Sequence, residues 1–311
     1  MKNKTIRKCL LALTLLLGGG MLPIVQARPQ NITTQLPRQY RAQTDTVEVQ
    51  SQKMQRAIKN VVVVPSQYYE GPQDQQYPVL YLLHGADGAY DNWSKKANLE
   101  LIANRYGMII VCPDGQDSWY FDSPIDPAMQ FETYVSSELV SYVDSHYRTF
   151  NSRHMRAITG LSMGGHGALW LAFRHPQVFG SCGSMSGGVD ISRFPGKWNI
   201  AKRLGDYQSN HEVWKQHTVV SLVPTIKSGQ NIAIDEGSED IFYEVNCNLH
   251  ELLMKHKIAH EFTIRPGGHT WAYWVNALDY QALFFDKAFK KGYANMLDEQ
   301  QQRAVPEKGS E

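Results

Sequence analysis

The sequence lacks an apolar run long enough to cross a membrane. Residues 9–17 are apolar, but Gly18-Gly-Gly20 and Pro23 interrupt the run well short of the roughly 20 residues that a helical span needs. Four basic residues precede this run, and Val25-Gln-Ala27 follows it as a small-residue cleavage site. This order predicts an export signal over residues 1–27, and therefore a periplasmic or secreted protein.

An excess of positive charge is also missing. Four of the 31 basic residues fall within the predicted signal, which leaves 27 against 30 acidic residues in the rest of the chain. Because no basic stripe remains, nucleic acid is not a predicted partner. The expected partner is a small-molecule or oligosaccharide substrate, and the sequence does not indicate an oligomeric state.

Cysteine is scarce, with four in the chain and one of them inside the predicted signal. The others, Cys112, Cys182 and Cys247, have no metal-like spacing, and the first two lie in apolar runs typical of buried strands. We expect free buried thiols, with one disulfide as the alternative. A zinc-protease motif is excluded as well, because Met254 occupies the place where the second histidine after His250-Glu251 would be needed.

No linker rich in proline, serine and glycine divides the chain after the signal, and no internal repeat is visible. One domain is therefore predicted over residues 45–293. Residues 28–44 are interpreted as an extended lead-in, and residues 294–311 as a disordered tail. Residues 187–230 break the surrounding pattern and are predicted to form an insertion over the active site.

The rest of the hydrophobic pattern alternates between strand-like and helix-like segments. Strands are predicted at 46–50, 57–64, 77–83, 108–112, 155–159, 181–186, 232–235 and 259–265, and helices at 95–105, 130–146, 164–174, 241–257 and 270–291. This alternation predicts an α/β protein with a mainly parallel central sheet, helices on both faces and an antiparallel N-terminal hairpin. Active groups of such a sheet collect at the carboxyl ends of its strands.

The sequence Gly160-Leu-Ser-Met-Gly164 matches the Gly-x-Ser-x-Gly nucleophile elbow. In this motif a serine sits on a strained turn between a strand and a helix and presents its hydroxyl above the sheet. A predicted strand precedes the motif here and a predicted helix follows it. The two glycines suit the tight backbone because they have no Cβ atom. Ser162 is therefore the predicted nucleophile.

A serine hydroxyl reacts well only when a base takes its proton, and elbow enzymes carry that base last in the order Ser, Asp/Glu, His. His269 follows Pro266-Gly-Gly268 directly after the last predicted strand. This places it at the carboxyl edge of the sheet, and it is the predicted base. His166 lies one helical turn after Ser162 and is interpreted as a packing or supporting residue.

The acid should lie in the loop after the strand that ends at Asp235, and Asp240 is the predicted residue. Asp235 and Glu239 are the alternatives. A different role for Asp240 is to cap helix 241–257, since aspartate is favoured at helix N-termini.

Two backbone amides usually form the oxyanion hole of such enzymes, one directly after the nucleophile and one in the loop after the third strand. Met163 would supply the first amide. Ala86, in His84-Gly-Ala86, would supply the second, with His84 holding the loop in place.

Several motifs together resemble the esterase D-type branch of the α/β-hydrolases over roughly residues 45–293. The motifs are Leu82-Leu-His-Gly-Ala86 with Trp93, Trp119-Tyr-Phe-Asp-Ser-Pro124, Glu132-Thr-Tyr134 with Glu138-Leu139, Gly160-Leu-Ser-Met-Gly-Gly165, Gly237-Ser-Glu-Asp240 and Gly267-Gly-His269. This branch includes feruloyl esterases, acetylxylan esterases, short-chain carboxylesterases, S-formylglutathione hydrolases and mycolyltransferases. The resemblance implies an acid at the aspartate of the Gly-x-x-Asp turn, which is Asp240.

We therefore predict an exported serine esterase that uses an acyl-enzyme, needs no metal or organic cofactor, and acts on feruloyl or acetyl esters of plant polysaccharide. Trp93, Trp119, Tyr120 and Trp271 are the predicted substrate-binding aromatics. A general short-chain carboxylesterase and an S-formylglutathione hydrolase-like thioesterase are alternatives. The thioesterases usually carry Ser-Gly-Leu-Thr-Cys where this chain has His84-Gly-Ala-Asp-Gly88. The alternative outside enzymes is a catalytically silent module that binds carbohydrate or a surface.

Overall fold

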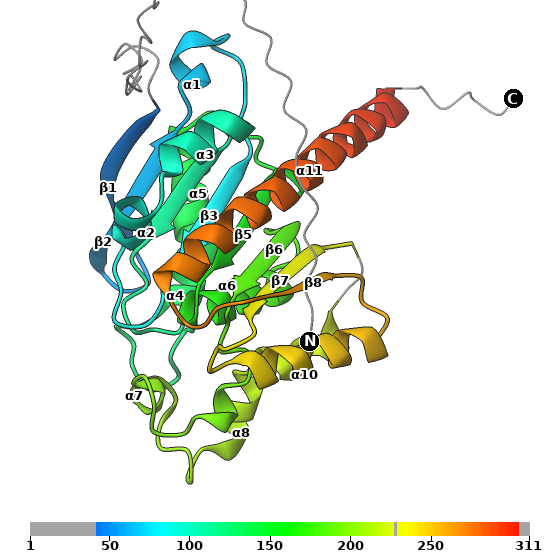
Figure 1. Ribbon diagram of the computed structural model, residues 1–311. Helices are drawn as coiled ribbons and strands as arrows, with labels where there is room; N and C mark the ends of the chain where they lie inside the picture. The colour runs from blue at the N-terminus through cyan, green and yellow to red at the C-terminus, as the bar shows by residue number, and fades with distance from the viewer. Residues whose placement is uncertain (1–41, 227–228, 305–311) are drawn as a thin grey trace, which may run out of the picture. The chain divides into compact units, whose positions relative to one another are not determined.

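The computed structural model describes residues 42–226 and 229–304, and the predicted export signal lies outside these residues. Eight strands form one sheet in the order β1-β2-β4-β3-β5-β6-β7-β8. They are β1 (Gln43–Ser51), β2 (Arg56–Val64), β3 (Val79–Leu83), β4 (Ile109–Pro113), β5 (Arg156–Gly160), β6 (Ser181–Met185), β7 (Asn231–Gly237) and β8 (Glu261–Arg265). β1 and β2 form an antiparallel hairpin, β2 pairs antiparallel with β4, and the other neighbours are parallel. The predicted sheet is confirmed (Figure 1).

The helices are α1 (Gln67–Glu70), α2 (Asn92–Lys96), α3 (Leu99–Tyr106), α4 (Phe131–Thr133), α5 (Val140–His146), α6 (Met163–Arg174), α7 (Ile200–Leu204), α8 (His211–Gln216), α9 (Val219–Leu222), α10 (Tyr243–Lys255) and α11 (Trp271–Ala304). The central strand β3 is buried at all five positions. Successive side chains of a strand point to opposite faces. Leu80 and Leu82 accordingly pack in the cluster formed with α3 and α11, while Tyr81 and Leu83 pack in the cluster that includes α6 and α10.

Two predicted helices are interrupted in the structure. The segment predicted as 95–105 divides into α2 and α3, because the Asn98 side chain accepts the Leu101 amide at 3.0 Å and starts a new helix there. The segment predicted as 130–146 contains a π-helical turn over Tyr134–Leu139. Within this turn the Ser136 hydroxyl donates to the Glu132 carbonyl at 2.7 Å. The side chain therefore bonds to the carbonyl that the Ser136 amide would use in a regular α-helix.

The C-terminal helix is longer than the sequence pattern predicts. α11 continues to Ala304, so the disordered tail expected from residue 294 is wrong as far as residue 304, and residues 305–311 lie outside the described part. Residues 294–304 contain neither glycine nor proline and consist mostly of good helix formers, which explains the extension. Of the helices in the described ranges, none combines the length and apolarity that a membrane crossing requires.

The segment 187–230 contains the short helices α7, α8 and α9 between β6 and β7. In Figure 1, α7 and α8, drawn in light green, lie beyond the end of the sheet where the parallel strands terminate. This is the edge at which the candidate catalytic residues also lie.

Candidate active site

Ser162 occupies a strained turn between β5 and α6. Its backbone has φ 55° and ψ −118°, a conformation that is rare for a residue with a side chain. The turn is held because the Ser162 amide donates to the Met185 carbonyl at 3.0 Å. A Cβ atom on Gly160 would lie 2.7 Å from backbone atoms of Gly164, and one on Gly164 would lie 2.5 Å from the His84 carbonyl oxygen. Both glycines are therefore required by close backbone approach.

A chain of hydrogen bonds connects three side chains from three loops. The His269 Nε2 atom lies 3.0 Å from the Ser162 hydroxyl oxygen, and its Nδ1 atom lies 3.0 Å from each carboxylate oxygen of Asp240. Asp240 can only accept, so Nδ1–H donates to it, and Nε2 is left free to accept the serine proton. The side chain of Asp240 is fully buried, whereas that of His269 is 23% exposed and faces the cavity.

The structure also separates Asp240 from its two rivals. Asp235 accepts from the Tyr273 hydroxyl at 2.5 Å and pairs with Arg265, and it has no hydrogen bond to His269 among the described contacts. Glu239 is exposed. Asp240 additionally accepts the Phe242 amide at 2.9 Å in the turn before α10. The N-cap of α10 is Phe242, so Asp240 does not cap this helix and its main contact is with His269.

His84 fixes the loop after β3. Its Nδ1–H donates to the Gly85 carbonyl at 2.7 Å, and its Nε2 accepts the Gly115 amide at 2.8 Å. The described peptide bonds are all trans, and in a trans peptide the C=O and N–H groups point in opposite directions. The Ala86 amide therefore points away from His84. A Cβ atom on Gly85 would lie 3.3 Å from the Ser162 Cβ, so this loop directly adjoins the elbow.

Met163 is the first residue of α6, and the first amides of a helix have no acceptor within the helix. Ala86 and Ser162 line the same cavity, whose volume is about 460 Å³. His269, Trp198, Trp271 and Trp274 form further parts of its wall. The cavity therefore brings together a hydroxyl, an imidazole and the loop residue Ala86 between aromatic side chains, and Met163 directly follows the serine.

Of the predicted binding aromatics, only Trp271 lies on the cavity wall. The other three, Trp93, Trp119 and Tyr120, are each at most 1% exposed. The prediction that they contact the substrate is therefore wrong. Their polar atoms bond instead to the carbonyls of Leu83, Trp198 and His84, respectively. These buried rings support the loops that form the cavity.

Trp198 is a cavity residue that the sequence pattern does not predict. It lies in the insertion, in a stretch without periodic pattern, so the sequence gives no signal that its ring faces the cavity. Its φ of 47° and that of Asn199, 57°, are both positive. The Trp119 indole N–H donates to the Trp198 carbonyl at 3.1 Å and helps to hold this strained pair.

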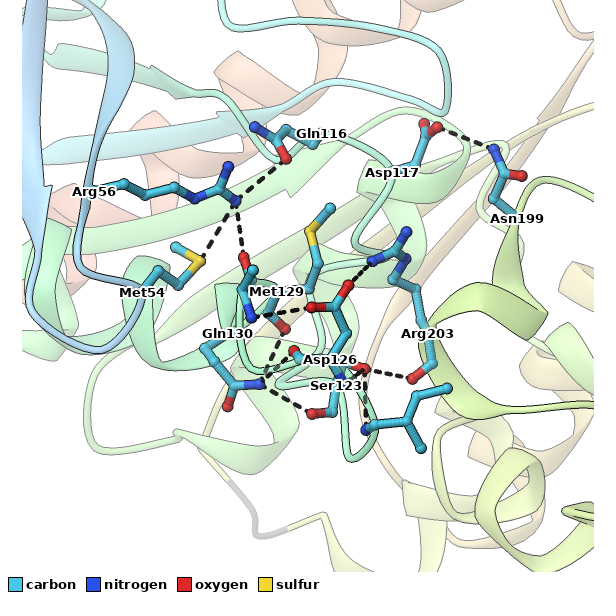
Figure 2. Close-up of polar contacts among 12 residues, drawn as sticks. Met54, Arg56, Gln116, Asp117, Ser123, Asp126, Met129, Gln130, Asn199 and Arg203 are labelled. Atoms are coloured by element: carbon cyan, nitrogen blue, oxygen red, sulfur yellow. Dashed lines mark hydrogen bonds and ion pairs between the residues drawn. The ribbon is translucent and has the colours of Figure 1, made fainter.

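Polar contacts attach the insertion to the loop that precedes α4 (Figure 2). Arg203 pairs with Asp126 at 2.7 Å, and the Arg203 carbonyl accepts the Ser123 hydroxyl at 2.6 Å. Asp117 accepts from the Asn199 side chain at 3.2 Å and from the Asp87 amide at 3.0 Å. Asp117 therefore connects the insertion to the loop that carries Ala86.

His166 supports the elbow from within the core. Its ring is fully buried, its Nε2 donates to the His217 carbonyl at 3.0 Å, and burial lowers its pKa to about 3. It is therefore neutral, in agreement with the predicted packing role. No cluster of three or more His, Cys, Asp or Glu side chains suited to a metal ion occurs in the described ranges. Cys112, Cys182 and Cys247 are free thiols.

The mainly parallel eight-stranded sheet and the serine elbow after β5 define an α/β-hydrolase. A family model described as "Putative esterase" matches residues 51–285, and the chain belongs to this esterase family. An acetyl esterase of Caldicellulosiruptor saccharolyticus is 25% identical over 249 residues, which cover 74% of this chain and 92% of that protein.

Solved structures agree with this assignment. A ferulic acid esterase superposes with a TM-score of 0.71 and 26% identity over 80% of this chain and 99% of its own. An S-formylglutathione hydrolase from Staphylococcus aureus superposes with a TM-score of 0.70 over 79% of this chain and 99% of its own, at 20% identity. At 20% identity, this hydrolase shows only that the two proteins share a fold.

Proposed function

We propose that the protein is an exported serine esterase that forms an acyl-enzyme on Ser162 and prefers feruloyl or acetyl esters of plant polysaccharide such as xylan. The observation that carries the catalytic part is the continuous hydrogen-bond chain from Asp240 through His269 to Ser162 at the floor of a cavity. The predicted signal over residues 1–27 supports export.

The reaction follows from this geometry. The Ser162 oxygen attacks the ester carbonyl carbon while its proton moves to His269 Nε2, and Asp240 stabilises the resulting imidazolium through Nδ1–H. The amides of Ala86 and Met163 donate to the oxyanion of the tetrahedral intermediate. His269 then protonates the departing alcohol. A water molecule, deprotonated by His269, attacks the acyl carbon, which releases the acid and restores the serine.

The aromatic side chains of the cavity support the proposal of an ester substrate with a flat or ring-shaped part. Trp198 and Trp271 come from the insertion and from the start of α11, respectively, and both line the cavity that contains Ser162. Indole faces pack well against aromatic acyl groups and other flat surfaces. The names of two similar proteins, an acetyl esterase and a ferulic acid esterase, agree with this preference.

The serine mechanism is tested with Ser162→Ala. Removal of a triad nucleophile can lower kcat by a factor on the order of 10⁶. The wild-type protein should be labelled at Ser162 by a fluorophosphonate probe, and the variant should lose both labelling and turnover with an unchanged melting temperature. Retention of more than about a tenth of the activity would remove Ser162 from the mechanism.

The substrate preference is tested by comparing kcat/KM on feruloylated or acetylated xylo-oligosaccharides with kcat/KM on methyl ferulate and p-nitrophenyl acetate. Binding of a remote sugar raises kcat/KM on the natural ester above that on a truncated one. Trp198→Ala should remove most of this advantage and leave the small esters nearly unaffected. Equal rates on sugar-linked and simple esters would instead indicate a general short-chain carboxylesterase.

The remaining alternatives give different outcomes in the same assays. An S-formylglutathione hydrolase-like enzyme would turn over the glutathione thioester faster than every oxygen ester. A silent binding module would bind xylo-oligosaccharide but show neither probe labelling nor turnover.

A further inference from the structure

A second carboxylic acid is buried beside the candidate triad. Glu236 is fully buried near the end of β7, four residues before Asp240. Within the described residues neither of its carboxyl oxygens has a hydrogen-bond partner of good geometry, although the Gly237 amide and the Asn246 side chain adjoin it. A buried ionised carboxylate without such partners is costly. The group is therefore unsuited to carry a charge here.

The side chain of Asn246, on α10, is oriented so that its oxygen remains available to accept a hydrogen bond. The Asn246 amide nitrogen donates to the carbonyls of Gly187 at 2.8 Å and Phe242 at 3.0 Å. These two acceptors fix the direction of the side-chain amide, because the reverse orientation would place its oxygen against both carbonyl oxygens. The Asn246 oxygen is left buried without a donor among the described residues. A protonated Glu236 carboxyl can supply that donor.

Asn246 in turn contacts the turn that supports the nucleophile. The Gly187 carbonyl accepts from it, and Gly187 packs against Gly165 in the first turn of α6. The next residue, Gly188, donates its amide to the Ser162 carbonyl at 3.3 Å. A continuous series of contacts therefore leads from Glu236 to the backbone of the elbow.

We propose that Glu236 is a protonated carboxylic acid in the working enzyme and acts as a positioning residue, donating to the Asn246 side-chain oxygen and thereby holding the Gly187 turn against the Ser162 elbow. The catalytic part of this inference rests on the proposed function, whereas the protonation state does not. Glu236 touches neither the reacting atoms nor the cavity wall.

The surrounding charges favour the neutral form. Burial, above all, and the neighbouring Asp240 and Asp235 raise the pKa of Glu236 to about 9, although the nearby Gly237 amide and Asn246 side chain act in the opposite direction and lower it. Tyr243 of α10 and Tyr273 of α11 are the other titratable groups that interact with it. A second negative charge beside Asp240 would also weaken the pairing of Asp240 with the imidazolium that forms during the reaction.

The sign of the pH effect follows from proton binding. Between the ordinary carboxyl pKa of 4.5 and about 9, the folded protein holds a proton on Glu236 that the unfolded chain has released. The free energy of unfolding therefore falls as pH rises through this window and levels off above it. A glutamine at this position cannot ionise, and its amide can still donate to Asn246.

The experiment compares the wild-type protein with Glu236→Gln, and uses Glu239→Gln as a control that removes an exposed carboxylate three residues away. Thermal unfolding is measured from about pH 5 to pH 10 without substrate. Glu236→Gln should flatten the decline of the melting temperature with pH, whereas the control should follow the wild-type curve. In infrared spectra, the wild-type protein should lose a protonated-carboxyl stretch on alkaline titration, and Glu236→Gln should not.

Activity provides the second readout. Glu236→Gln should keep kcat/KM within about threefold of wild type at neutral pH, while the wild-type rate should fall relative to it by about tenfold per pH unit above the pKa of Glu236. Glu236→Leu removes the donor and should lower kcat without raising KM. An unchanged alkaline decline in Glu236→Gln would overturn the positioning role.

The two proposals fail separately. If the wild-type protein hydrolyses no ester, the unfolding and infrared measurements still decide whether Glu236 is protonated. If those measurements show an ionised carboxylate at neutral pH, the inference is wrong whatever the activity.

Discussion

Asp240 has two kinds of contact, and substitution can separate them. Asp240→Asn keeps a side-chain oxygen that can accept the Phe242 amide but loses the charge that pairs with His269. Loss of such a charge lowers kcat by roughly 10⁴, whereas weakening a single hydrogen bond in the turn costs only about 1 kcal/mol of stability. We therefore expect a large drop in kcat with only a small change in melting temperature.

Asp235→Asn is the matched comparison for this prediction. Asp235 pairs with Arg265 and accepts from Tyr273, so its substitution should lower the melting temperature and largely spare kcat. Steady-state kinetics and thermal unfolding of the two variants show which aspartate acts with His269. Greater damage to kcat from Asp235→Asn at unchanged folding would reassign the acid.

For individual residues, the sequence predicts function where a motif fixes both the residue type and its position. The elbow motif and the order along the chain predict Ser162, Asp240 and His269, and the structure brings these three side chains together. Trp198 and Glu236 have no comparable signal. The first depends on a strained loop, and the second on which groups adjoin it after folding. The opposite error is seen for three aromatic residues that were predicted to bind substrate but are buried, namely Trp93, Trp119 and Tyr120. Their position near a loop does not reveal whether the ring points into the cavity or into the core.

Among the elements, the insertion combines side chains packed in the core, such as Ile200 and Trp214, with a partly buried ion pair to the loop before α4. Arg203 is 9% exposed and pairs with Asp126, so Asp126→Ala leaves the guanidinium without its charged partner. The cost is about 1–3 kcal/mol, and the melting temperature should fall by several degrees. Because Arg203 lies in α7, which begins two residues after Trp198, we expect KM for a sugar-linked ester to rise more than KM for p-nitrophenyl acetate.

A control for this prediction is Lys95→Ala, which removes an exposed ion pair with Asp91 within one helix turn. Pairs of this kind contribute little to stability, so neither KM nor the melting temperature should change measurably. An Asp126→Ala variant with the same properties as this control would show that the anchor does not hold the insertion.

The elements themselves were largely predictable, because buried parallel strands give continuous apolar runs and amphipathic helices give a clear period. Their interruptions were not. The break before α3 depends on the side chain of Asn98, and the widened turn before α5 coincides with a hydroxyl of Ser136 bonded to a backbone carbonyl. Local side-chain bonds of this type leave no mark on the hydrophobic period.

For the molecule as a whole, the fold was predicted more accurately than the extent of its last helix. In α11, Phe285 and Phe289 are buried, whereas Tyr293 and Leu297 are 45% and 41% exposed. Truncation after Met296 should therefore leave the melting temperature and kcat nearly unchanged. Truncation after Phe284 removes both buried phenylalanines and should destabilise the protein by roughly 3–5 kcal/mol for each.

Circular dichroism on heating measures both truncations, and activity on p-nitrophenyl acetate monitors the site. A large loss of stability on removal of residues 297–311 would show that the end of α11 contributes to the fold. The contrast between the two cuts marks where this helix stops packing on the sheet.

The order in which the chain supplies its candidate catalytic residues has a consequence for biosynthesis. Ser162 and His269 are separated by 107 residues, and the helix that follows His269 covers one face of the sheet. A growing chain therefore exposes its nucleophile long before its base exists. Until translation has passed β8 and α11 has docked, the nascent polypeptide cannot cleave esters. Hydrolytic activity thus emerges only with the completed fold, so that the compartment in which the chain folds is the compartment in which it first becomes an enzyme.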